Sequence, residues 1–206
     1  MNIVDKRVLK KIKQYGKISQ RQLSEVCGFS LGKVNQSIQF LQKEEYVDEE
    51  WNLTEKSTKL IDLYKPKKAI ILAAGLGMRM VPINTEVPKA LLTVKGETLI
   101  ERLIHQLHEV NVYDITVVVG FMKEEFEFLI DEYKVKLVCN MDYAKKNNLH
   151  SLAKVGSDLI NTYIIPCDIW CETNPFNACE LYSWYMVKNQ ETDNTSVRLN
   201  LSLIHI

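Results

Sequence analysis

A glycine-containing loop near the middle of the chain is the first place where the residue types suggest chemistry. Gly75 and Gly77 follow an apolar run, and Arg79 comes two positions after Gly77. Because glycine has no Cβ atom, backbone amides at Gly75 and Gly77 can approach an anion closely, and the Arg79 guanidinium can add a bidentate phosphate contact. Tight strand-to-helix turns also use glycine for steric reasons alone. The loop therefore suggests a phosphate site without establishing one.

Two more charged residues follow rigid or apolar stretches. Lys89 comes after Pro88, which fixes the backbone beside an apolar segment. Asp168 follows the apolar run 163–166. A carboxylate at the end of a parallel strand lies where an α/β sheet binds ligands, so Asp168 is a candidate Mg²⁺ ligand. The alternatives are that Arg79 and Lys89 are solvated surface charges and that Asp168 caps the next turn.

A parallel sheet is the element that would position these side chains. Continuous apolar runs at 69–74 and 115–120 predict strands buried on both faces, and shorter runs lie at 135–139 and 163–166. Helical stripes lie between them, so strands alternate with helices and the pattern predicts an α/β fold. His105 and His108 share one helical stripe. Three-residue spacing can bind a metal, but without a third ligand a structural role is favoured.

The first 64 residues follow a different pattern. Amphipathic helices are predicted at about 4–15, 19–27 and 30–41, followed by a small β-hairpin over 46–54 and a helix over 55–64. This order resembles a winged helix-turn-helix domain. A proline between lysines interrupts the helical pattern near Pro66 and predicts a short linker.

DNA binding by this part of the chain is one of two interpretations. The helix beginning near Ser30 would lie in a major groove, with its polar face reaching bases or phosphates through Lys33, Gln36 and Ser37. Residues 1–66 hold 12 Lys and Arg against 9 Asp and Glu, a modest excess, and the hairpin tip 48–50 is acidic and would repel phosphate. The alternative is therefore an interaction or regulatory module.

Composition narrows the class of protein. The 206 residues carry 26 basic and 26 acidic side chains, which excludes the strongly basic profile of a nucleic-acid coat protein. No apolar stretch approaches the roughly 20 residues that span a bilayer, and the charged start lacks the apolar core of a signal peptide. We therefore expect a cytoplasmic protein without membrane contact. The five cysteines form no CxxC pair, so reduced thiols are expected.

The glycine loop and the lysine segment together resemble a family signature. Residues 72–82 and 88–92 are similar to the two-part motif of nucleotidyltransferases that join an NTP to a phosphorylated small molecule. The resemblance implies a Rossmann-like αβα sandwich that uses Mg²⁺. It also implies that Arg79 binds the outer phosphates, that Lys89 faces the phosphate under attack and that Asp168 is a metal ligand, with Cys167 replacing the usual small residue before it. The triphosphate would be wrapped by residues of the loop, namely Ala73, Ala74, Gly75, Leu76 and Gly77.

Two later segments narrow the resemblance to one branch. Residues 118–126 and 139–152 look like those of bacterial CTP:phosphocholine cytidylyltransferases. This implies CTP and phosphocholine as substrates, with Gly120, Asn148 and Ser151 near the nucleotide or acceptor. From the sequence alone, 148–151 reads as a helix N-terminus with polar caps. A choline headgroup needs aromatic faces, and the candidates, which are more often core residues, are Trp170, Tyr182, Trp184 and Tyr185.

The sequence leaves two alternative functions open and predicts two domains. A sugar-1-phosphate nucleotidyltransferase and a nucleotide-sensing DNA-binding regulator with a degenerate transferase domain remain open. We expect a winged helix-turn-helix domain over 1–64, a linker over 65–68, the N-terminal part of a nucleotidyltransferase domain over 69–200 and a tail of uncertain origin over 201–206. Only 140 residues follow Pro66, fewer than the family's catalytic domain normally has, so we expect a fragment of a longer protein.

Overall fold

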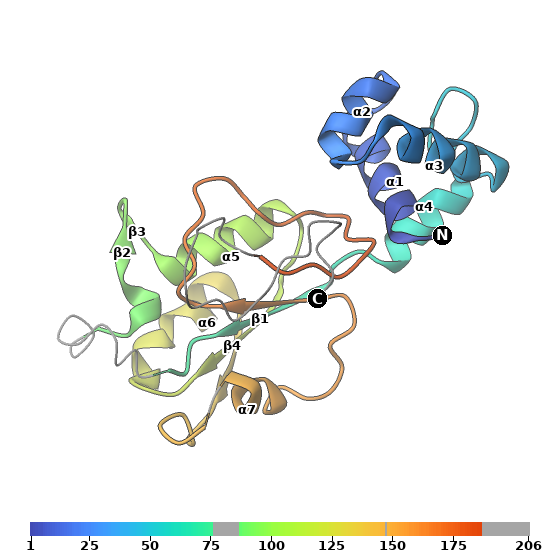
Figure 1. Cartoon of the computed structure of the whole chain (residues 1–206). Helices are drawn as coiled ribbons and strands as arrows, with labels where there is room; N and C mark the ends of the chain where they lie inside the picture. The colour runs from blue at the N-terminus through green and yellow to red at the C-terminus, as the bar shows by residue number, and fades with distance from the viewer. Residues whose placement is uncertain (76–86, 147, 187–206) are drawn as a thin grey trace, which may run out of the picture.

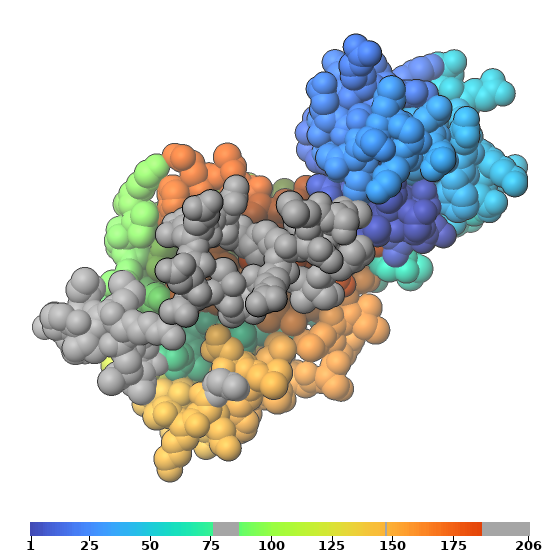
Figure 2. Space-filling model, in the orientation of Figure 1, coloured from blue at the N-terminus to red at the C-terminus, as the bar shows by residue number. Residues whose placement is uncertain are grey.

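The computed structural model describes residues 1–75, 87–146 and 148–186 and contains two structural units (Figure 1). The N-terminal helical unit (residues 1–64) consists of four helices, and the α/β unit (residues 68–176) is built on a parallel sheet. Figure 2 shows the helical unit beside the α/β unit as a lobe of its own. The helices of the N-terminal unit are α1 (Ile3–Tyr15), α2 (Gln20–Cys27), α3 (Leu31–Lys43) and α4 (Glu55–Leu63).

Local capping signals define the bounds of α2, whereas Ser30 precedes α3 without a capping hydrogen bond from its side chain. Ser19 accepts a hydrogen bond from the Gln22 amide in a capping box that begins α2, and Gly28 ends α2 in the left-handed region with φ 67°. Between α3 and α4 the expected hairpin is reduced to one antiparallel bridge, between Val47 and Leu53. The helix order and this short wing agree with the predicted winged helix-turn-helix arrangement.

The sheet of the α/β unit contains four parallel strands. They are β1 (Lys68–Leu72), β4 (Asp114–Val119), β5 (Lys136–Cys139) and β6 (Thr162–Pro166), in the order β5-β4-β1-β6. In register, Leu72 of β1 lies between Val118 of β4 and Pro166 of β6. The carboxyl ends of these three strands therefore meet at one edge, where an open α/β sheet binds its ligands.

Helices cover both faces of this sheet. Ala69, Ile71 and Ala73 face a core made with α5 (Leu99–Glu109) and α6 (Phe128–Tyr133). Ile70, Leu72 and Ala74 face the other side, where hydrophobic residues of and after α7 (Asn148–Ala153) pack. This two-residue alternation confirms the predicted α/β sandwich. A small antiparallel hairpin of β2 (Thr93–Val94) and β3 (Glu97–Thr98) precedes α5.

A connecting segment (residues 168–182) returns from the end of β6 to the helical unit, so the two units touch beyond their linker (Figure 1, orange to red). Cys179 and Leu181 are 6% and 0% exposed and belong to the same hydrophobic core as Val8, Leu9 and Ile12 of α1. The helical unit is thus completed by residues that lie far away in the sequence. Within the described ranges, no helix has both the length and the apolar character needed to cross a membrane.

Candidate active site

The candidate residues of the site gather where β1 and β6 end. The amide of Ala73 donates to the carbonyl of Val118 at 2.8 Å, and the amide of Cys167 donates to the carbonyl of Leu72 at 3.2 Å. These bonds continue the sheet by one residue past both strands. Gly75 and Asp168 therefore leave the sheet at the same edge, as the apolar runs and the following polar residues predict.

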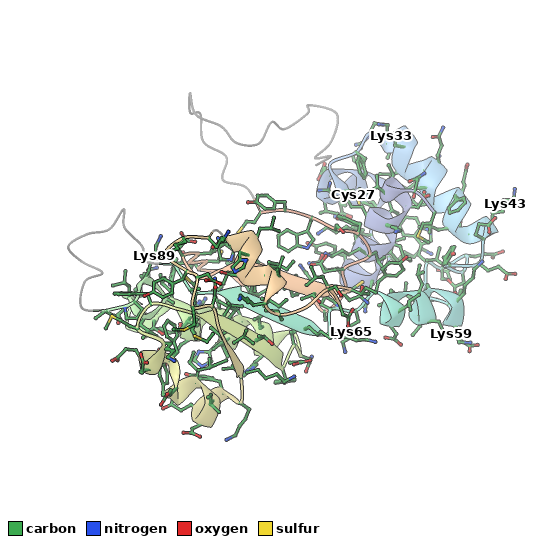
Figure 3. All side chains as sticks on the ribbon, turned by 90° about the horizontal axis from the view of Figure 1, so that it is seen from below. Cys27, Lys33, Lys43, Lys59, Lys65 and Lys89 are labelled. Atoms are coloured by element: carbon green, nitrogen blue, oxygen red, sulfur yellow. The ribbon has the colours of Figure 1, made fainter. Side chains whose placement is uncertain are left out.

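Lys89 and Asp168 lie side by side although 79 residues separate them. The Lys89 ammonium donates to Asp168 Oδ2 at 2.8 Å, and the two side chains are 29% and 44% exposed. A short 3-10 helix (Lys89–Leu91) positions the lysine, because Pro88 precedes it and Ala90 is buried in the core. Figure 3 shows Lys89 at the end of the α/β unit opposite the linker residue Lys65. Both charges are accessible to a ligand from solvent.

The beginning of the glycine loop is held by its backbone. Ala73 and Ala74 are each 4% exposed, so their methyl groups belong to the core and they can meet a nucleotide only through main-chain atoms. Gly75 is exposed. The other loop candidates, Leu76, Gly77 and Arg79, lie outside the described residues, and their roles stay predictions.

Gly120 fixes the position of this loop by close packing. A Cβ atom at residue 120 would lie 2.8 Å from the Ala74 carbonyl oxygen and 2.8 Å from Tyr143 Cβ, closer than real Cβ contacts. Only glycine lets these three segments approach one another in this way. The Tyr143 ring also lies against Phe121, at 6.5 Å between centroids. Tyr143 was absent from the sequence-based candidates, because its proximity to Ala74 depends on the sheet.

Ser151 and Asn148 differ in their accessibility. Ser151 is 3% exposed and its hydroxyl accepts a 2.9 Å hydrogen bond from the side chain of Asn140, itself fully buried. The Asn140 amide in turn donates to the Val119 carbonyl at the end of β4. The expectation that Ser151 contacts a ligand is therefore corrected: it anchors the chain after β5. Asn148 is exposed at the start of α7, and its contact with a nucleotide stays a prediction.

Thiol chemistry is unfavourable beside Asp168. Burial, with a smaller contribution from the Asp168 carboxylate, raises the pKa of Cys167 to about 12. A thiol in that state is protonated at neutral pH and is a poor nucleophile. Among the described residues, no group of three or more His, Cys, Asp and Glu side chains could hold a metal. His105 contacts Glu97, which agrees with a structural role. The role of Asp168 as a metal ligand stays a prediction.

The candidate DNA contacts on α3 fall into two groups. Lys33 and Gln36 are exposed, and Figure 3 shows Lys33 and Lys43 pointing away from the α/β unit. Ser37, in contrast, is 3% exposed, and its hydroxyl donates to Asp5 Oδ1 of α1 at 2.8 Å. Ser37 therefore lies on the inner face of α3, and its expected contact with DNA is corrected to a bond between helices.

Three of the four aromatic candidates for a choline headgroup, Tyr182, Trp184 and Tyr185, line one cavity of about 770 Å³. Trp170 lies beneath the Lys95 ammonium, at 4.8 Å from the ring centroid. Tyr182 packs against the helical core, and the Trp184 ring lies 6.3 Å from that of Tyr163. Tyr182, Trp184 and Tyr185 therefore share one cavity, Trp170 lies apart from it, and a choline enclosure stays a prediction.

Comparison with known proteins agrees with both units. Residues 1–48 match a family of winged helix-turn-helix DNA-binding domains. The choline-phosphate cytidylyltransferase of Streptococcus pneumoniae is 41% identical over 128 residues, which cover 62% of this chain and 56% of that protein. The 2-aminoethylphosphonate cytidylyltransferase of Lancefieldella rimae is 47% identical over 85 residues, covering 41% of this chain and 35% of that protein. The chain thus spans about half the length, or less, of these curated relatives.

A solved structure of a cytidylyltransferase is also similar to this chain. The CTP:phosphocholine cytidylyltransferase from Streptococcus pneumoniae superposes with a TM-score of 0.54 and 44% identity, over 55% of this chain and 50% of that one. The family of MobA-like NTP transferase domains matches residues 69–174, more than half of the 206 residues. This range contains Lys89, Asp168 and the four-stranded sheet except its first residue, Lys68, and the chain belongs to that family.

Proposed function

We propose that the α/β unit binds CTP and transfers its cytidylyl group to a phosphorylated small molecule, with phosphocholine the favoured acceptor. The observation that carries this proposal is the Lys89–Asp168 pair at the carboxyl edge of the sheet, beside the start of the glycine loop. Two relatives named for cytidylyl transfer support the choice of CTP. The acceptors in their names, choline phosphate and 2-aminoethylphosphonate, both combine a phosphorus acid with an amine or ammonium group.

The chemistry requires positioning and charge neutralisation. A phosphate oxygen of the acceptor attacks the α-phosphorus of CTP, the bond from that phosphorus to the bridging oxygen breaks, and pyrophosphate leaves with the electron pair. Because the attacking phosphate is already an anion at neutral pH, no general base is needed. Lys89 supplies positive charge at the phosphate under attack, and the exposed backbone at Gly75 supplies amides.

The donor set at Asp168 fits Mg²⁺. This ion usually keeps several waters and binds through one or two carboxylates plus substrate phosphates, so a single exposed carboxylate beside a nucleotide is sufficient. Asp168 would hold the ion, which would neutralise charge on the phosphates. Before ligand binding, the hydrogen bond from Lys89 keeps the Asp168 carboxylate oriented toward the site.

A pyrophosphate release assay tests the proposal. The chain is incubated with CTP, Mg²⁺ and phosphocholine, and parallel reactions contain 2-aminoethylphosphonate, glucose 1-phosphate or another NTP. We expect pyrophosphate with CTP and phosphocholine and its loss in Asp168→Asn. Turnover with glucose 1-phosphate alone would show that the acceptor is a sugar 1-phosphate and not phosphocholine. Absence of both turnover and CTP binding by calorimetry would refute the proposal.

We also propose that the helical unit binds DNA through α3. The family match to residues 1–48 and the exposed Lys33 and Gln36 support this function. The wing is unsuited to phosphate, because its tip carries the carboxylates of Asp48 and Glu49, which repel a polyanion; hydrogen bonds from Asn52 further lower the pKa of Asp48. Fluorescence anisotropy with duplex DNA tests it: Lys33→Ala should weaken binding and flatten its salt dependence. Equal binding by the wild type and Lys33→Ala would contradict the role of α3. CTP-dependent DNA retention without turnover would favour a regulator over an enzyme.

A further inference from the structure

The connecting segment begins at the candidate active site and is then fastened to α5. Asp168, its first residue, pairs with Lys89. Three residues later, the Cys171 carbonyl accepts hydrogen bonds from Arg102 at 3.2 Å and from Gln106 at 2.9 Å, both of α5. Asn174 donates back to the Gln106 carbonyl at 2.7 Å. These bonds hold the segment along the helix that packs on the sheet.

Glu180 joins β6 to the helical unit near the other end of this segment. Its side chain is 9% exposed and forms an ion pair with Lys10 of α1 at 2.5 Å. The Tyr163 hydroxyl of β6 shares its proton between the same carboxylate at 3.0 Å and the Asn177 carbonyl at 2.9 Å, and it accepts from the Asn177 amide at 3.0 Å. Buried charges persist in proteins when they are paired and hydrogen-bonded, as Glu180 is. One carboxylate therefore contacts both units.

Leu181 extends this junction into the core of the helical unit. It is fully buried, in one cluster with Leu9 of α1 and Leu23 of α2. Tyr182 follows it, and the Lys10 ammonium lies 5.9 Å from the centre of that ring. A displacement of residues 180–182 would thus disturb the packing of α1, which itself bonds α3 through the Asp5–Ser37 contact.

Both ends of this connection are able to respond to a ligand. At Asp168, a nucleotide with its cation would compete for the carboxylate and ammonium that now pair with each other. At the junction, a cavity of about 770 Å³ lined by Tyr64, Tyr163, Glu180 and Tyr182 leaves room for a second arrangement. The exposed face of α3 points away from this junction (Figure 3), so DNA and nucleotide would not compete for one surface.

We propose that the connecting segment couples nucleotide binding at the Lys89–Asp168 site to the packing of α1, and through α1 to DNA binding by α3. This inference rests on the proposed function and adds regulation to it. Since coupling is reciprocal, DNA would change the affinity for CTP by the same factor as CTP changes the affinity for DNA. Glu180 and Tyr163 are the positioning residues that carry the coupling between the two units.

Hydrogen exchange of the full chain, with and without CTP and Mg²⁺, tests the coupling without requiring a DNA target. In the wild type, we expect exchange to change in peptides from 69–75 and also in α1, by about fivefold, the lower end of typical coupling. Glu180→Gln, which keeps the size of the side chain, should abolish the change in α1 and preserve that in 69–75. Tyr163→Phe, which removes only the hydroxyl, should reduce the change in α1. Glu125→Gln, an exposed site on the α/β unit, is the matched control and should behave as the wild type.

Each contrary result has a distinct meaning. A CTP effect confined to the α/β unit of the wild type would overturn the coupling and leave the proposed function intact. An α1 response that persists in both Glu180→Gln and Tyr163→Phe would overturn the assigned route. No change anywhere in the wild type, including 69–75, would overturn nucleotide binding and the coupling together.

Discussion

Replacing Lys89 with methionine separates a catalytic role of this lysine from a structural one. Methionine keeps most of the length and the apolar stem of lysine and removes the ammonium that donates to Asp168 at 2.8 Å. The two side chains are 29% and 44% exposed, so solvent screens the pair, and such exposed pairs contribute about 0 to 1 kcal/mol to stability. We therefore expect the midpoint of thermal unfolding to fall by less than about 4 °C.

The expected effect on turnover is much larger. Removing one preorganised group that stabilises transition-state charge typically costs about 100- to 1000-fold in kcat, or about 2.7 to 4 kcal/mol. A loss of the ion pair alone supplies too little free energy to account for this. Pyrophosphate release from CTP and phosphocholine measures kcat, and scanning calorimetry of the same samples measures stability.

Lys136→Met is the matched control for this experiment. Lys136 also pairs with an aspartate, Asp114, at 2.7 Å, but these residues begin β5 and β4 at the opposite edge of the sheet. It should change stability as little as Lys89→Met does and leave turnover unchanged. Turnover of Lys89→Met within fivefold of the wild type would refute the catalytic role. Equal losses of turnover in Lys89→Met and Lys136→Met would indicate that both substitutions act by disturbing the fold.

Three further substitutions test the packing. Gly120→Ala should lower the free energy of unfolding by about 1 to 3 kcal/mol in urea titrations, because the new methyl group would lie 2.8 Å from the Ala74 carbonyl oxygen. Gly32→Ala is the control, since its Cβ has open space, and it should be neutral or stabilising. A larger loss in Gly32→Ala than in Gly120→Ala would contradict the packing argument. Ser37→Ala should cost about 1 to 3 kcal/mol by the same measurement, since it leaves an oxygen of the buried Asp5 carboxylate without its donor, and an unchanged stability would place Ser37 on the surface. A hydrogen bond from the Thr98 hydroxyl, which caps α5, lowers the pKa of Glu101 from its usual 4.5, so this carboxylate stabilises the fold above that pH and the contribution is lost as pH falls through its folded-state pKa. Glu101→Gln should therefore reduce the loss of unfolding free energy at acid pH, and identical curves of stability against pH for the two proteins would contradict this.

Local sequence signals predicted the elements and much of the site. The six-residue apolar run at 69–74 required burial on both faces, and the structure divides it alternately between two cores. Asp168 lies at the carboxyl edge of the sheet because parallel strands end there, a rule that the predicted alternation of strands and helices makes applicable from the sequence. Lys89 reaches the same edge from the 3-10 helix Lys89–Leu91, which the strand rule does not place. Resemblance to a family assigned Lys89 to the phosphate under attack and Asp168 to a metal, and neither assignment predicted the ion pair between them.

The sequence could not predict whether small polar residues are exposed or buried. Ser37 and Ser151 occupy positions that helical periodicity leaves ambiguous, since a hydroxyl tolerates burial once it has a partner. Their partners are Asp5, which is 32 residues from Ser37, and Asn140, which follows β5 and is 11 residues from Ser151. Neither spacing is a local signal. Both serines were therefore assigned to ligand contact, whereas each bonds two elements of the fold.

The junction at Glu180 was unpredictable for a related reason. Its ion pair with Lys10 spans 170 residues, and nothing in the composition of the connecting segment marks Leu181 as a core residue of the helical unit. Each residue near it has an ordinary local explanation. Only the return of the chain after β6 places them beside α1.

These placements suggest a division of labour between exposed and buried residues. Lys89 and Asp168 are charged, partly exposed and paired with each other, so their pairing adds little to stability and is easily exchanged for contacts with phosphate and cation. Gly120, Asn140 and Ser151 are buried, and they fix the segments that border the same edge of the sheet, while the expected contact of Gly120 with a nucleotide stays a prediction. Substitutions in the first group should therefore lower turnover with little change in stability. Substitutions in the second should lower stability first, because the site is preorganised by the packing beneath it.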